Sequence, residues 1–130
     1  MKKYGRKTRD IVFFSAKNQT TLCVHTPQAW RYAKLLEEDT RIRSYEVNHP
    51  LDAAWIARID RVGIRGAYLQ TQWTTDFVIT DQDGGEAVRE IVTADLLGKH
   101  AEIEKLELSR RYWKARGVED WRLVLTGEAE

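Results

Sequence analysis

The stretch 73–92, WTTDFVITDQDGGEAVREIV, constrains the fold of this chain more than any other segment. Its segments FVIT (77–80) and AVREIV (87–92) are rich in β-branched residues, which favour strands. Between them, DQDGG (81–85) supplies the aspartates and glycines that tolerate the backbone of a tight turn. The pattern therefore predicts a β-hairpin, with Asp76 near the start of its first strand and Glu90 in its second.

Such a hairpin would bring the carboxylates of Asp76 and Glu90 together. Two acids on neighbouring strands form a rigid pair of oxygen ligands, of the kind that holds Mg²⁺ for phosphodiester hydrolysis. A purely structural interpretation is also open, in which Asp76 caps a strand and Glu90 is a solvated residue on an alternating face. The hairpin alone favours this structural interpretation.

Length and composition limit the classes of protein to which this chain can belong. The chain has 130 residues and is 42% hydrophobic, which suits one domain with a real core, and we place that domain at 10–130. The only cysteine, Cys23, lies in an apolar run, so we expect a core thiol, no disulfide framework and no cysteine-rich zinc site. No apolar run suits a signal peptide or a membrane span. We expect a cytoplasmic protein of a prokaryotic cell with no membrane partner.

The net charge of +1 hides a basic start to the chain. Residues 1–9 are predicted to be a flexible arm that carries five cations against the single Asp10 that follows. Clustered cations bind the phosphates of nucleic acids, so the arm is a candidate DNA-binding segment, although a solubilising tail fits equally well. The candidate DNA-binding residues are Lys2, Lys3, Arg6, Lys7 and Arg9.

The remaining pattern alternates strands and helices. Thr26 and Pro27 are an N-cap and a first helical residue, and they predict a helix over 27–38. Thr93 is a candidate cap for a helical region that continues over 99–116 and ends at Gly117. The predicted strands are 10–17, 20–26, 41–47, 51–60, the two hairpin strands and 121–126. The last is expected to be buried on both faces, and 51–60 also fits a helix. Together these elements predict an α/β fold, a central mixed sheet of four to five strands flanked by helices.

In order and spacing, six segments of the chain resemble the N-terminal domain of TnsA, the endonuclease subunit of heteromeric transposases. They are HTPQAWRYAKLLEED, RIRSYEVNHP, WTTDFVI, AVREIV, KLELSRRY and WRLVLTGE, and Ser15 and Lys17 echo the family's Ser-x-Lys. The resemblance implies a restriction-endonuclease-like PD-(D/E)xK fold. It also implies that Asp76, in WTTDF, is the metal-binding aspartate and that Glu90 is the acid of the Glu-x-Lys motif.

The chain departs from the family at important positions. The family's catalytic lysine, two residues after the acid, is replaced by Val92, and its helix glutamate is replaced by Ala29; His49 stands where the family has glutamine. Neither a methyl nor an isopropyl group can bind a metal or move a proton. The resemblance then implies a degraded site, unless Lys99 or Lys105 from the following helix replaces the lysine in space.

Two hypotheses about the function follow, and both place the chain in a transposition system. In the first, the chain is a catalytically dead subunit that binds DNA, a transposase partner, or both. In the second, it is a Mg²⁺-dependent DNA endonuclease that uses Asp76, Glu90 and a migrated lysine; with two acids alone, Mg²⁺ binding should be weak. An unrelated α/β binding protein of a phage or mobile element is a third interpretation, and a homo-oligomer is left open.

Overall fold

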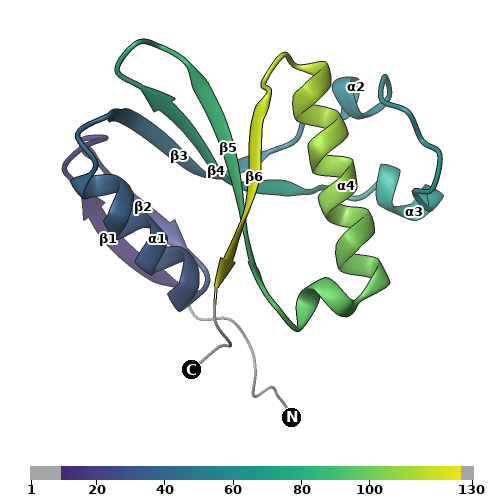
Figure 1. Ribbon diagram of the computed structural model, residues 1–130, viewed down its shortest axis with the longest axis horizontal. Coiled ribbons are helices and arrows are strands. Elements are labelled where there is room, and N and C mark those ends of the chain that lie inside the picture. The colour runs from purple at the N-terminus through teal and green to yellow at the C-terminus, as the bar shows by residue number, and fades with distance from the viewer. Residues whose placement is uncertain (1–9, 127–130) are drawn as a thin grey trace.

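The computed structural model describes residues 10–126 as an α/β structure (Figure 1). The basic arm predicted at 1–9 lies outside the described residues. In chain order the elements are β1 (Ile11–Ser15), β2 (Thr20–Val24), α1 (Pro27–Glu38), β3 (Ile42–Pro50), α2 (Ala53–Ile56), α3 (Gly66–Leu69), β4 (Thr74–Asp81), β5 (Glu86–Thr93), the 3₁₀ turn η1 (Leu96–Gly98), α4 (His100–Ala115) and β6 (Asp120–Thr126).

A four-stranded mixed sheet forms the centre, in the order β3-β4-β5-β6. Strand β4 is antiparallel to both β3 and β5, whereas β6 returns through α4 and lies parallel to β5. The predicted hairpin is β4 and β5, with Phe77 opposite Arg89. Strands β1 and β2 form a separate hairpin, tied to β3 by a hydrogen bond from the Tyr45 N–H to Asn18 Oδ1 (2.8 Å).

The two long helices cover opposite faces of this sheet, as Figure 1 shows. Helix α1 packs through Ala33 and Leu36 on the face that carries Phe77 and Ile79. Helix α4 packs through other residues, among them Leu108 and Tyr112, on the face that carries Val78 and Val88. Because side chains alternate along a strand, neighbouring residues of β4 and β5 belong to different layers. The predicted mixed sheet with a helix on each side is confirmed.

The ends of the long helices follow their sequence signals. The Thr26 side chain accepts a hydrogen bond from the Ala29 N–H (3.1 Å), and Pro27 is the first helical residue, so α1 begins where the cap predicts. After α4, Gly117 adopts φ +90°, the left-handed conformation that glycine allows at a helix end.

Two parts of the predicted secondary structure are wrong. Residues 51–60 do not form a strand: Asp52 accepts the Ala54 N–H (2.9 Å) and starts the single turn of α2. Thr93 caps no helix, because it ends β5 and its hydroxyl donates to Asp95 Oδ1 (2.5 Å). At Asp52 a local capping interaction decided a segment too short for its periodicity to be informative, whereas Thr93 is predicted as a helix cap although strand pairing continues through it.

Two predictions of burial are also wrong. Strand β6 is an edge strand, and Leu125 on it is 59% exposed, so the strand is not buried on both faces. Cys23 is only partly buried, because Leu22 and Val24 are the residues of β2 that turn towards the core. None of the helices within residues 10–126 is long and apolar enough to cross a membrane.

Candidate acid-pair site

The hairpin brings Asp76 and Glu90 together, as the sequence predicts. Each carboxylate accepts a hydrogen bond from the backbone of the other strand: Glu90 Oε1 from the Asp76 N–H (3.0 Å) and Asp76 Oδ2 from the Ile91 N–H (2.8 Å). This reciprocal arrangement holds the two side chains in fixed positions without any contribution from a loop. We call these two residues the acid pair.

The acid pair is largely withdrawn from water, and Glu90 is only 4% exposed. Burial raises the pKa of Asp76, with the Ile91 N–H and the charge of Lys105 acting in the opposite direction. Burial, followed by the nearby charge of Asp76, raises the pKa of Glu90 to about 7. Two carboxyl groups held close together and shielded from water resist carrying two negative charges at once. The pair therefore retains a proton under conditions in which exposed carboxyl groups have lost theirs.

Helix α4 and strand β6 support Glu90 from the other side. The Ser109 hydroxyl donates to Glu90 Oε2 (2.6 Å), and the indole N–H of Trp121 donates to Ser109 Oγ (3.0 Å). Both oxygens of Glu90 therefore already accept a hydrogen bond from the protein. Neither Ser109 nor Trp121 was predicted as a site residue. The one available signal was a small polar residue, Ser109, between the apolar Leu106, Leu108 and Tyr112 of a helix.

The two candidate lysines behave differently. The charge of Lys105 lowers the pKa values of both Asp76 and Glu90, which places its ammonium group within electrostatic reach of the pair. The same ammonium group lies 5.6 Å from the ring centre of Trp73. Lys99 instead precedes α4 as an exposed residue, and its charge acts on Asp95. Of the two lysines, only Lys105 has a charge that acts on the acid pair.

The positions that depart from the transposase family lie as follows. Val92 is 1% exposed, so the place of the catalytic lysine is part of the packed interior. Ala29 packs with the Phe77 cluster, on the face of the sheet opposite to Glu90. A glutamate at residue 29 would thus lie in the other layer from the acid pair. His49 bonds to Glu46 (2.7 Å) and contacts the Trp113 ring.

The donor set of the acid pair fits Mg²⁺ poorly. This ion requires near-octahedral oxygen coordination at short distances. Within residues 10–126, no third aspartate, glutamate, histidine or cysteine lies close enough to Asp76 and Glu90 to complete a three-ligand group. Each Glu90 oxygen already accepts one hydrogen bond, which leaves a single lone pair on each for an ion. Any Mg²⁺ held by this pair would be bound weakly.

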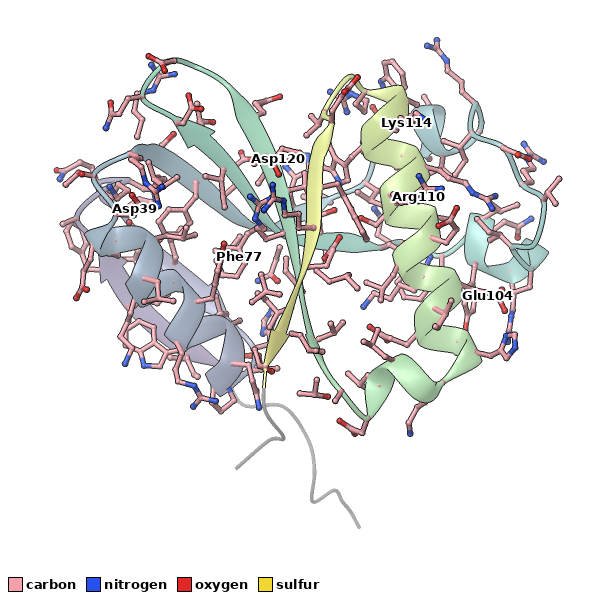
Figure 2. All side chains as sticks on the ribbon, in the orientation of Figure 1. Asp39, Phe77, Glu104, Arg110, Lys114 and Asp120 are labelled. Atoms are coloured by element: carbon pink, nitrogen blue, oxygen red, sulfur yellow. The ribbon has the colours of Figure 1, made fainter. Side chains whose placement is uncertain are left out.

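Helix α4 carries a surface with several cations, which we call its basic surface, although Glu119 and Asp60 also line it. Arg110 and Lys114 line two adjoining hollows, one of about 380 Å³ that reaches Trp121 and one of about 340 Å³ that reaches Arg58. Figure 2 shows Arg110 and Lys114 on the same helix as Glu104 and in its second half. These cations are visible in the sequence, but a charged helix face usually has no function beyond contact with solvent. Their clustering with Arg58 depends on the fold, so it could not be predicted from the sequence.

Comparison with known proteins identifies no relative: no protein-family model and no curated protein matches the chain. The features that bear on function are therefore the acid pair, its supporting hydrogen bonds and the basic surface of α4.

Proposed function

We propose that this chain is a nuclease-fold, TnsA-like subunit that binds DNA in a transposition system and does not itself cleave it. The observation that carries the proposal is the state of the acid pair. Asp76 and Glu90 match, by the family resemblance, metal-binding acids on adjacent strands, yet Glu90 is buried, its pKa is raised, and both carboxylates accept hydrogen bonds from the protein.

The absence of the family's catalytic lysine and helix glutamate also argues against catalysis by this chain. Phosphodiester hydrolysis in such sites needs a positioned water and neutralisation of the charge on the leaving oxygen. Val92 supplies neither, and residue 29 belongs to the opposite layer of the sheet. Losing a single electrostatic donor costs on the order of 10²-fold in rate. The restriction-endonuclease-like topology is itself part of this proposal, and a helix on each face of a mixed sheet is compatible with it.

Charge supports the DNA-binding part of the proposal. The start of the chain carries Lys2, Lys3, Arg6, Lys7 and Arg9. Arg110 and Lys114 add a second basic region, where Arg110 also bonds to Glu107 and Lys114 is exposed. DNA phosphates bind such surfaces through counterion release, which needs no cavity. The expectation of a transposase partner is based on the family resemblance alone.

One observation favours the second candidate function, an active Mg²⁺-dependent endonuclease. Lys105 lowers the pKa of both acids, which a migrated catalytic lysine would also do. If Lys105 fulfils that role, replacing it by methionine should abolish cleavage but leave DNA binding largely unchanged.

A plasmid nicking assay with Mg²⁺ or Mn²⁺, run beside a salt series of DNA-binding measurements, tests the proposal. We expect no nicking by the natural sequence, and DNA affinity that falls steeply with salt. Replacing the five arm cations by glutamine should reduce the slope of log K against log salt by about 4.5, since each phosphate contact contributes about 0.9.

Further variants test which residues contribute to DNA binding and which to cleavage. Arg110→Glu with Lys114→Glu should weaken DNA binding, whereas Lys34→Gln, at an exposed lysine of α1, should not. Nicking by the natural sequence that disappears in both Asp76→Asn and Lys105→Met would overturn the proposal in favour of the endonuclease. The absence of DNA binding at low salt would rule out the DNA-binding part, and binding that does not depend on salt would rule out phosphate contacts by these cations.

A further inference from the structure

A second group of ionisable side chains lies at the open end of the β1–β2 hairpin, away from the acid pair. It consists of Asp10, Cys23 and His25, whose carboxylate oxygen, sulfur and ring nitrogen all lie within 4.8 Å of one another. The closest two are His25 Nδ1 and Asp10 Oδ1, which are 2.9 Å apart. Within residues 10–126 this is the one group of three potential metal ligands at such separations.

The hairpin itself creates this arrangement. Cys23 and His25 are two residues apart on an extended chain, so their side chains point to the same side. Ile11 pairs with Val24, which places Asp10 beside His25 on the neighbouring strand. The intervening Val24 is 2% exposed and turns to the interior, so the three ligands share the outward side of the hairpin. Their spacing is therefore set by strand pairing and does not depend on a loop.

The chemistry of the three groups selects the kind of ion. A thiolate, an imidazole and a carboxylate are ligands of Zn²⁺, whereas Mg²⁺ prefers oxygen ligands alone. We propose that Asp10, Cys23 and His25 bind one Zn²⁺ ion, with three protein ligands and an open fourth coordination position. This site would be separate from the acid pair and requires no cleavage of DNA.

The three ligand atoms would have to move only slightly closer together to bind Zn²⁺. Zn²⁺ binds nitrogen and oxygen at about 2.0–2.2 Å and sulfur at about 2.3 Å, so tetrahedral ligand atoms are roughly 3.3–3.7 Å apart. The largest separation between the ligand atoms, 4.8 Å, exceeds the tetrahedral separation by little more than 1 Å. Rotation of the side chains can supply this movement. The side chains of His25 and Asp10 are 49% and 70% exposed, so an ion can reach them from solvent. Binding would replace the hydrogen bond between them.

Cobalt titration of the full chain, reduced and without a histidine tag, tests this site. Co²⁺ can take the place of Zn²⁺ and reports a bound thiolate by a charge-transfer absorption band. We expect one Co²⁺ per chain, a thiolate band that Zn²⁺ removes by competition, and an increase in thermal stability on adding Zn²⁺, because an ion that binds the folded state stabilises it. Affinity should rise with pH, since the ligands bind in their deprotonated forms.

Variants identify the ligands. Cys23→Ser should abolish the thiolate band, and His25→Ala should weaken binding by more than the roughly 10–100-fold that loss of a supporting residue costs. His49→Ala is the matched control, because it removes another imidazole bonded to a carboxylate, that of Glu46. Asp76→Asn should also leave the titration unchanged. The absence of a thiolate band, or an affinity for Co²⁺ that is unchanged in His25→Ala, would overturn the proposal.

Discussion

Replacing Glu90 by glutamine should change how the stability of the protein depends on pH. The pKa of Glu90 is raised to about 7 from the 4.5 of an ordinary glutamate. A group whose pKa is raised in the folded state retains its proton better there than in the unfolded chain. Its contribution to stability is therefore complete below about pH 4.5 and is lost as the pH rises through 7.

The size of the effect follows from the two pKa values. The difference of about 2.5 (7 minus 4.5), at about 1.4 kcal/mol for each tenfold change in proton affinity, gives on the order of 3 kcal/mol. Glutamine has the shape of the protonated acid and can still accept the Asp76 N–H while its amide group faces Ser109. Glu90→Gln should thus have little effect at pH 5 and stabilise the protein at pH 8.

Urea denaturation followed by tryptophan fluorescence, repeated from pH 5 to pH 8, measures this difference. The free energy of unfolding of the natural sequence should fall with pH, and that of Glu90→Gln should fall much less. Glu86→Gln, at an exposed position of the same strand, is the matched control and should follow the natural sequence. Parallel curves for Glu90→Gln and the natural sequence would refute the reasoning.

Three further changes test the packing and support of the site. Phe77→Ala, at a fully buried ring that contacts Tyr32, should cost about 3–5 kcal/mol in urea denaturation, and a cost below 1 kcal/mol would contradict its place in the core. Thr26→Ala removes the cap of α1 and should cost about 1 kcal/mol, whereas Thr26→Ser should cost much less. Ser109→Ala removes a hydrogen bond that lowers the pKa of Glu90, so that pKa should rise further; a carboxyl titration by NMR that shows a fall would count against the assigned contact.

The parts of the fold with strong local signals could be predicted from the sequence. The β4–β5 hairpin has β-branched strands around a turn rich in aspartate and glycine, and α1 has both a capping threonine and a proline. The contact between Asp76 and Glu90 followed from the hairpin, because pairing in a tight hairpin leaves few registers.

Other features depend on which elements become neighbours. The exposure of Leu125 follows from the edge position of β6, which composition does not reveal. The support of Glu90 by Ser109 joins two elements through a tertiary contact, and the proximity of Asp10 to His25 depends on the register of β1 and β2. No local pattern encodes these contacts, so sequence reasoning could not find them.

The measurement that tests the central claim most directly is a crystal structure of the chain grown with sub-millimolar Mn²⁺, analysed by anomalous scattering. The account holds that the acid pair binds a proton where an active nuclease binds a metal ion. It predicts no manganese between Asp76 and Glu90, with Glu90 still bonded to Ser109. A manganese ion bound to both carboxylates, with the Lys105 ammonium group turned towards it, would contradict the account and indicate an active endonuclease.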